Sequence, residues 1–542
     1  MIFRRDFLKA SAATGALATM FFVRSGVAEG NIGAENADLD QGVDAAPPKP
    51  WLESVSVGDF GAIGDADPAN AERNSKAIQE ALNTNNSVYL GGESEVYAIA
   101  TSLKMHPGQR IYGNGATLIA SRRMSQILSA ADDVAIEGIL FDSNNRPPRN
   151  GVPIQATGAV YGINIRDISG CRVRKCVFIR YKRGVSVTSS GSGMKCTNHL
   201  FEDCRAIAGF VWPDWRSGNE QLGAYVGSEA RPVTRAISNY SEFARDAEDV
   251  HDIRFLNWSA HEGQYGLALH RCSKVKVKGG KFREMSRAIS IQHQSRDISI
   301  IGVLVENSDS AGIHIAQGAH QILIEDNSIF GTMANDNAGI QGYYGVRNII
   351  VRNNILDSQF DKWKIGIGGE SRRPGAAIRF GQQVENVTIS GNKMRGFRWG
   401  ILLKTTIYDE VIHSSDPNYF ASGIRNFIIE NNKIFGDYYF TQAGSQKSHI
   451  KKDTFGVLVA ISAPWENKRK GGWDIANIKI RQNWSDNLGK SFACFRSDTW
   501  AWVYSPNFLE NSVYLCGNVS TNSQADLSAS GLEYAIESNC TN

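Results

Sequence analysis

A short alternation of apolar and polar positions returns six times between residues 266 and 404. Each copy begins with a small residue and continues with the period of a strand that buries one face. The copies are Gly266–His270, Ala288–Gln292, Gly312–Ala316, Gly339–Tyr343, Ala377–Gly381 and Gly400–Lys404. The first four begin 22, 24 and 27 residues apart, and the last two begin 23 apart. Short strands repeated at this spacing, without a helical pattern, predict a β-solenoid whose coils stack on one another.

A second apolar pattern lies between these copies and ends in asparagine. Its clearest examples are Asn348–Asn354, Asn386–Asn392, Asn426–Asn432 and Asn477–Asn483. Asparagine tolerates the left-handed backbone of a tight turn, and stacked asparagine amides bond to one another. The pattern therefore predicts an internal, structural ladder formed by Asn327, Asn354, Asn392, Asn432 and Asn483.

The coil of strand, asparagine turn and strand resembles that of the pectate-lyase and polygalacturonase superfamily. The segment Val55–Asp65 followed by Ala77–Ala81 resembles the strand and capping helix that begin those proteins, although Asn70–Asn74 replaces their Asp-Asp-Thr. The resemblance implies an all-β fold, a right-handed parallel β-helix, with an N-terminal capping helix near Asn74–Leu82. It covers residues 51–542 as one domain and leaves the activity open, because this fold carries many functions.

The first 50 residues predict export and a linker. Arg4 and Arg5 begin a twin-arginine motif, an apolar run follows, and residues 1–28 therefore predict a signal peptide with cleavage after Ala28. Residues 29–50 are polar and end in Pro47–Pro50, which is typical of a linker. We expect a periplasmic or secreted protein. A net charge of +3 favours neither a nucleic-acid partner nor a membrane surface.

Long insertions interrupt the coil period near residues 209–249, 359–373, 405–423 and 437–473. Irregular segments of this length in a compact fold are usually functional. Trp212 and Trp215, in the first insertion, could stack on sugar rings or pack against the side of the solenoid.

The cysteines predict two kinds of structure. Cys171, Cys176 and Cys204 are interpreted as packed thiols, and Cys516 and Cys540 as a pair that could close a C-terminal loop.

Candidate chemistry lies on the outer face of the Gly-Ile strands, where the resemblance places active sites. Since the residue after each small residue points inward, the next one and the one two further on point outward. That face gathers His270, Gln292, His314, Gln341, Tyr343, Arg379 and Lys404, and it contains no carboxylate. His314, Gln341 and Arg379 should lie on consecutive coils at steps of ~4.8 Å.

This residue set favours β-elimination on a uronic acid over hydrolysis. Elimination needs a group that neutralises the sugar carboxylate, a base and an acid. Arg379 with Gln341 suits the first task, and His314 and Tyr343 suit the other two. His270, Gln292, His293, Lys404, Trp212 and Trp215 are candidate substrate-binding residues. The predicted partner is a polysaccharide or oligosaccharide, with no cofactor, no bound metal and no assignment of an oligomeric state.

Two alternatives remain open at this stage. Glycosidases need a pair of acids. Asp309 and Asp336 lie in the turns before the first strands and Glu370 lies in the insertion at the same edge, where the three could overhang the cleft. Aspartate before a Gly-Ile strand is also ordinary turn chemistry. The other alternative is a glycan-binding solenoid without catalysis.

Overall fold

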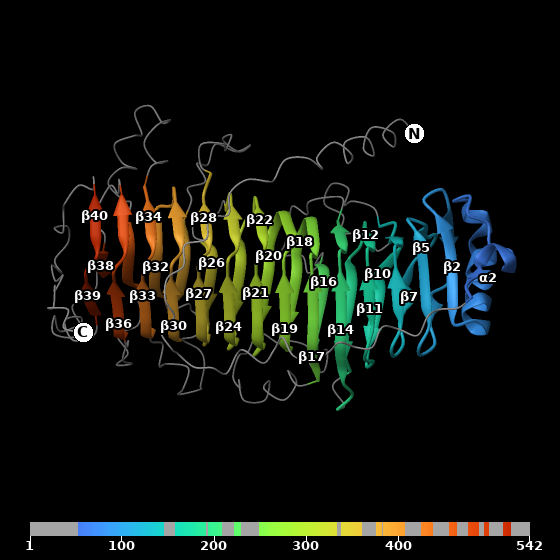
Figure 1. The fold of residues 1–542 in the computed structure, drawn as a ribbon, viewed down its shortest axis with the longest axis horizontal. Helices are drawn as coiled ribbons and strands as arrows, with labels where there is room; N and C mark the ends of the chain where they lie inside the picture. Colours follow the sequence, from blue (N-terminus) through green and yellow to red (C-terminus); the bar gives the residue numbers. More distant parts are fainter. Residues whose placement is uncertain are drawn as a thin grey trace. The chain divides into compact units, whose positions relative to one another are not determined.

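Three ladders of parallel strands make up the fold in the computed structural model. The structure describes residues 53–145, 158–190, 193–208, 222–228, 249–332, 338–359, 375–381, 383–406, 424–436, 455–462, 475–486, 493–497 and 513–521. These residues belong to a unit that begins at Glu53, and the predicted signal peptide lies outside the described residues. Successive coils follow one another from β2 to β39 (Figure 1). This is the predicted parallel β-helix.

The second strand of each coil belongs to one sheet of fifteen strands in sequence order. These strands are β1 (Val55–Ser56), β2 (Ser87–Gly92), β5 (Arg110–Asn114), β8 (Ala135–Glu137), β11 (Arg172–Arg174), β14 (Cys196–Glu202), β17 (Val250–Leu256), β19 (Ser273–Lys278), β21 (Arg296–Ile301), β24 (His320–Glu325), β27 (Arg347–Arg352), β30 (Val384–Ser390), β33 (Ile424–Glu430), β36 (Ile475–Arg481) and β39 (Val513–Cys516).

The first strand of each coil contains the Gly-Ile pattern, and we call this ladder the first sheet. Its strands are β4 (Leu103–Lys104), β7 (Met124–Ser129), β10 (Ala159–Arg166), β13 (Arg183–Ser189), β16 (Leu222–Ser228), β18 (Ser259–His270), β20 (Lys281–Gln292), β23 (Ala311–Ala316), β26 (Ala338–Tyr343), β29 (Ala376–Gly381), β32 (Trp399–Thr406), β35 (Phe455–Ser462) and β38 (Ala493–Ser497). Strand β16 lies inside the predicted insertion 209–249 and pairs with both β13 and β18, so part of that segment is a coil of the β-helix.

The third ladder consists of short strands that follow the asparagine turn. They are β3 (Val96–Ile99), β6 (Thr117–Ala120), β9 (Leu140–Asp142), β12 (Val177–Ile179), β15 (Arg205–Ile207), β22 (Leu304–Glu306), β25 (Ser328–Phe330), β28 (Ile355–Asp357), β31 (Lys393–Arg395), β34 (Lys433–Phe435), β37 (Trp484–Asp486) and β40 (Val519–Thr521). Strands β18 and β20 are long enough to belong to both this ladder and the first sheet.

A capping helix covers the start of the coil, as predicted. Two short 3₁₀ helices, η2 (Val57–Phe60) and η3 (Pro68–Asn70), precede α2 (Ala71–Thr84). Ile78, Ala81 and Leu82 of α2 are fully buried. The buried amide of Asn74 accepts a hydrogen bond from the Ile63 backbone N–H at 2.7 Å and donates one to the Ile63 carbonyl at 3.0 Å. None of the helices among the described residues is long and apolar enough to cross a membrane.

Close packing at the corner of each coil explains the small residue that begins each first strand. A Cβ at Gly312 would lie 2.7 Å from the Gly339 carbonyl oxygen and 2.9 Å from Ile329 Cγ2. Real Cβ atoms do not approach other atoms this closely, so a larger residue would displace the neighbouring coil. The inward residues form one continuous core, with Trp258 packed edge-on against Phe201 and Phe255.

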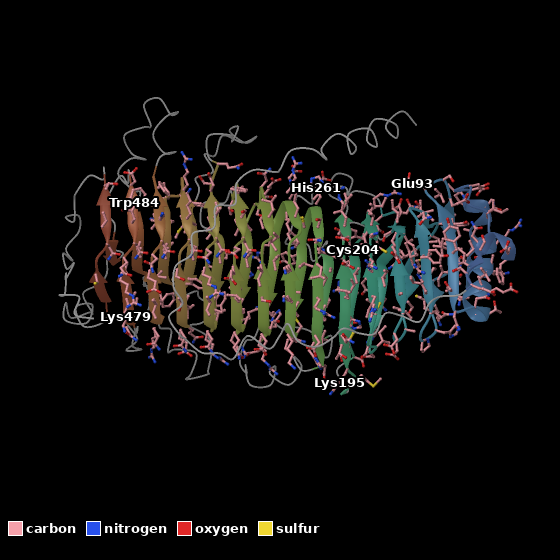
Figure 2. All side chains as sticks on the ribbon, in the orientation of Figure 1. Glu93, Lys195, Cys204, His261, Lys479 and Trp484 are labelled. Atoms are coloured by element: carbon pink, nitrogen blue, oxygen red, sulfur yellow. The ribbon has the colours of Figure 1, made fainter. Side chains whose placement is uncertain are left out.

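The asparagine ladder is internal, as predicted. Asn327, Asn354, Asn392 and Asn432 are fully buried, and Asn483 is 1% exposed. From Asn354 onward, each side-chain oxygen accepts hydrogen bonds from the backbone N–H and the amide of the asparagine one coil earlier, at 2.9–3.0 Å. The Asn327 oxygen, at the start of the ladder, accepts from the Val303 backbone N–H at 2.9 Å. Cys176 and Cys204 occupy the same turn position in earlier coils and are buried free thiols, as is Cys171. The prediction of packed thiols is confirmed for all three, and Cys204 lies within the coil stack (Figure 2).

Acid should destabilise the fold through His199. Burial lowers the pKa of this histidine to about 3, so the native state does not bind a proton that the unfolded chain takes up below about pH 6.5. The stabilising effect is complete above pH 6.5 and is lost as the pH falls toward 3, at about 1.4 kcal/mol per pH unit. Between about pH 6.5 and about pH 4.5, the free energy of unfolding should therefore fall by about 2–3 kcal/mol less in His199→Gln than in the parent protein. Denaturant unfolding at the two pH values measures both changes. Equal losses in the two proteins would contradict this assignment.

Candidate functional site

The outward face of the first sheet brings four predicted residues together. His314 of β23 pairs with Gln341 of β26, and Gln341 pairs with Arg379 of β29. Tyr343 lies two residues beyond Gln341 on the same strand. The predicted register and the order of the coils are therefore confirmed. Three of these side chains are shielded from solvent, with exposed fractions of 6% for His314, 2% for Gln341 and 9% for Arg379, and Tyr343 is half-buried.

The His314 imidazole is held by the preceding coil. Its Nδ1 lies 3.2 Å from the Gln292 amide nitrogen, which donates to it, and 3.3 Å from the Ser290 hydroxyl. The Gln292 amide also donates to the Ser290 hydroxyl at 2.9 Å. Burial holds the pKa of His314 well below its ordinary value, and the positive charge of Arg287 lowers it further. His314 is therefore a neutral imidazole near pH 7.

Tyr343 connects the other three groups. Its hydroxyl donates a hydrogen bond to the Gln341 side-chain oxygen at 3.3 Å. The Arg379 guanidinium carbon lies 5.2 Å from the centre of the Tyr343 ring, which is the geometry of a cation–π contact. The His314 and Tyr343 rings are 6.4 Å apart between centres. An imidazole, a phenol, an amide and a guanidinium thus converge on three consecutive coils.

A second group of basic side chains extends this face toward the N-terminus. The His270 ring contacts His293 at 5.1 Å and Tyr225 at 5.6 Å between centres, edge to face in both cases. Arg183 lies over the Tyr225 ring at 4.2 Å. Burial holds the pKa of His270 well below its usual range, and His293, Arg183, Arg271 and Arg287 lower it further. Burial likewise lowers the pKa of His293 to about 4.

The other predicted binding residues are placed differently. Gln292 pairs in register with His270 and also contacts His314, so it joins the two groups. Lys404 lies on β32 at the far end of the face and is half-buried. Between Lys404 and Arg379 the face becomes apolar, because Leu402 packs with Ala338, Ala376 and Trp399. Trp212 and Trp215 lie outside the described residues.

Arg287 is a residue of this face that the sequence reasoning did not select. It lies on β20 immediately before Ala288, the small residue that begins this copy of the pattern. Outward positions were predicted only among the residues that follow Ala288. Its guanidinium donates to the Tyr265 hydroxyl at 3.3 Å and to the Ser310 hydroxyl at 3.5 Å. Strict alternation would assign Arg287 to the inward side, two residues before Ile289. Ala288 and Ile289 both belong to the core, so the alternation breaks at the small residue and Arg287 lies on the outward face.

Carboxylates lie at the turns that precede the first strands. Asp309 is exposed there, between β22 and β23, and its backbone N–H donates to the Met285 carbonyl at 3.0 Å. Asp336 and Glu370 lie outside the described residues. The same edge carries a group that sequence reasoning missed: His261, Glu262 and Glu284, whose ligand atoms all lie within 4.8 Å of one another. Glu262 and Glu284 are separated by 22 residues, as Gly266 and Ala288 are, so the coil period places them one coil apart. It does not give the direction of their side chains, which depends on the left-handed backbone at both residues.

The comparisons establish similarity in fold. A family model described as periplasmic copper-binding protein (NosD) matches residues 214–373. No curated protein matches the chain. The N-terminal fragment of the bacteriophage phi29 gene product 12 is similar with a TM-score of 0.51 and 13% identity, covering 87% of this chain and 71% of the fragment.

Two further solved structures are similar over most of the chain. The A-module of the mannuronan C-5 epimerase AlgE6 of Azotobacter vinelandii has a TM-score of 0.47 and 14% identity, with 87% of this chain and 99% of the module covered. The surface adhesin PfbA of Streptococcus pneumoniae has a TM-score of 0.45 and 12% identity, with 83% of this chain and 93% of the adhesin covered.

Proposed function

We propose that this protein is a periplasmic or secreted polysaccharide lyase that cleaves a uronic-acid polymer by β-elimination, in the manner of the pectate-lyase superfamily. One observation carries the proposal: His314, Gln341, Tyr343 and Arg379 converge on three consecutive coils, and the outward positions of the six Gly-Ile copies contain no carboxylate. This set can supply a base, an acid and a carboxylate clamp. It cannot supply the pair of acids that hydrolysis of a glycosidic bond requires.

Arg379 and Gln341 form the carboxylate clamp. The C5 proton of a uronate becomes acidic only when the negative charge that develops on the adjacent carboxylate is stabilised. A guanidinium offers paired N–H donors that match the two oxygens of a carboxylate. Burial of Arg379 and Gln341 strengthens these interactions, because water does not compete for the same donors.

His314 acts as the base and Tyr343 as the acid. The neutral imidazole takes the C5 proton, the C5–H electron pair forms the C4=C5 double bond, and the C4–O bond breaks. The Tyr343 hydroxyl donates its proton to the leaving oxygen, and proton exchange with solvent restores both groups. The lowered pKa keeps His314 unprotonated before the substrate binds, and a bound carboxylate beside it raises that pKa during the reaction.

Gln292 acts as a positioning residue in this scheme. Its amide now donates to Nδ1 of His314, which leaves the proton of the neutral ring on Nε2. If the amide turned by 180°, its oxygen would accept a hydrogen bond from Nδ1–H and so favour the other tautomer of the ring. In that tautomer Nε2 has a free electron pair, which points away from Gln292. The Ser290 hydroxyl can serve either orientation, because it both donates and accepts hydrogen bonds.

The basic side chains around His270 extend the proposed site along the coils. His270, Gln292 and His293 lie next to the reacting group, and Lys404 lies beyond it. The positive charges of Arg183, Arg287 and Arg379, spread over several coils beside the neutral histidines, suit a chain with repeated negative charges better than a small metabolite. Trp212 and Trp215 remain proposed stacking residues for the sugar rings.

Product analysis tests the function against its alternatives. The purified protein is incubated with a panel of acidic polysaccharides, and the ultraviolet absorbance of a conjugated C4=C5 bond is followed together with reducing ends. We expect both signals to rise in step on at least one uronic-acid polymer. Reducing ends without ultraviolet absorbance would support the hydrolase that uses Asp309, Asp336 or Glu370. Binding without either signal would support a glycan-binding solenoid.

A further inference from the structure

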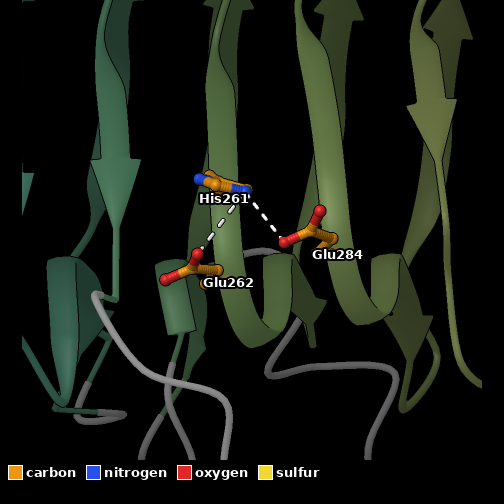
Figure 3. Close-up of side chains that lie close together, drawn as sticks. All are labelled: His261, Glu262 and Glu284. Atoms are coloured by element: carbon orange, nitrogen blue, oxygen red, sulfur yellow. Dashed lines mark hydrogen bonds and ion pairs between the residues drawn. The ribbon is translucent and has the colours of Figure 1, made fainter. Parts of the chain in front are cut away.

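Three metal-ligating side chains meet at the turn between the third and first strands of two successive coils. His261 and Glu262 lie on β18, and Glu284 lies on β20 (Figure 3). His261 Nε2 is 3.2 Å from a Glu284 carboxylate oxygen and 3.7 Å from a Glu262 carboxylate oxygen. One imidazole nitrogen therefore faces two carboxylates that come from different coils.

The backbone fixes this convergence. His261 pairs in register with Arg283, so the residues that follow them, Glu262 and Glu284, occupy equivalent positions one coil apart. Both have left-handed backbones, with φ values of 55° and 54°. The two negative charges are thus held next to each other and repel, and a cation bound between them, in addition to the Arg283 guanidinium beside Glu284, would relieve that repulsion.

Arg283 orients one of the carboxylates without occupying the oxygen that faces the imidazole. Its Nε lies 3.3 Å from Glu284 Oε1, whereas Glu284 Oε2 faces His261 Nε2. An outer partner of this kind holds a metal-ligating carboxylate in one orientation. The side chains of His261, Glu262 and Glu284 are 25%, 29% and 38% exposed, so water can complete a coordination sphere.

The donor set suits a divalent first-row transition metal. Imidazole nitrogen and carboxylate oxygen are ligands of Cu²⁺ and Zn²⁺, and Cu²⁺ binds most tightly in the divalent series. The family model described as copper-binding covers residues 214–373, which include all three side chains. The chemistry of these residues fits that metal. The set lacks the six to eight oxygen ligands that Ca²⁺ takes.

We propose that His261, Glu262 and Glu284 bind one divalent transition-metal ion, and that Cu²⁺ binds most tightly. The ion joins two coils at the edge of the β-helix, at the opposite end of β18 from His270. The site is separate from the proposed lyase residues, and its existence does not depend on the lyase function.

Copper binding is tested on the purified protein after treatment with a chelator. Isothermal titration calorimetry with a Cu²⁺ salt measures affinity and stoichiometry, and electron paramagnetic resonance of the bound ion reports nitrogen ligation. We expect one tight site whose spectrum shows coupling to one imidazole nitrogen. His261→Asn and Glu284→Gln should each weaken binding on the order of 10–100-fold or more.

His251→Asn is the matched control, because His251 also pairs with a neighbouring carboxylate, that of Asp252, on the preceding strand β17. This variant should keep the affinity and the spectrum of the parent protein. Thermal unfolding without metal verifies that each variant is folded. Parent-like copper binding in both His261→Asn and Glu284→Gln, or no stoichiometric binding by the parent protein, would overturn the proposal.

Discussion

Replacing Tyr343 with phenylalanine should lower kcat on a uronic-acid polymer by on the order of 10²–10⁴-fold. The change removes the hydroxyl that bonds Gln341 and keeps the ring beneath the Arg379 guanidinium. The packing of this face should therefore survive, while the leaving oxygen loses its proton donor. Initial rates of double-bond formation, measured at saturating substrate, give the ratio directly.

Asp309→Asn is the informative partner of this variant. Asp309 is exposed at the turn before β23, so its substitution should leave the lyase rate within a few fold of the parent value. The hydrolase hypothesis requires the reverse pattern. Loss of activity in Asp309→Asn together with full activity in Tyr343→Phe would refute the roles assigned to His314 and Tyr343.

Replacing Asn392 with alanine should lower the free energy of unfolding by about 3–5 kcal/mol, because several buried groups each lose a hydrogen bond at once. The Asn392 side-chain oxygen accepts from the backbone N–H of Asn354 at 3.0 Å and from its amide at 2.9 Å. The Asn392 amide donates to the Val351 carbonyl and to the Asn432 side-chain oxygen, both at 3.0 Å. Denaturant unfolding measures the change.

A second asparagine ladder supplies the control. Asn386 donates to Asn348 at 3.0 Å and accepts from Asn426 at 2.9 Å, with all three side chains exposed. Water can replace these bonds, so Asn386→Ala should cost only about 1 kcal/mol, chiefly from its left-handed backbone. Similar losses in Asn386→Ala and Asn392→Ala would show that burial of the ladder does not determine its contribution.

The sequence determined the architecture because its signals are local and repeated. A period of two along each Gly-Ile copy fixes which residues point outward, and a regular coil length fixes which residues become neighbours. His314, Gln341 and Arg379 were therefore predicted on adjacent coils, and their pairing is observed. The asparagine ladder followed from the same reasoning, since one turn position recurs in every coil.

Only the tertiary structure decided what surrounds these positions. The alternation predicts that the His314 side chain points outward. It does not predict that this side chain is only 6% exposed, or that burial and Arg287 keep it neutral. The group of His261, Glu262 and Glu284 was also hidden, because it depends on the conformation of two turns in different coils. Strand periodicity fixes the direction of a side chain, whereas solvent access and contacts between turns depend on how complete coils pack.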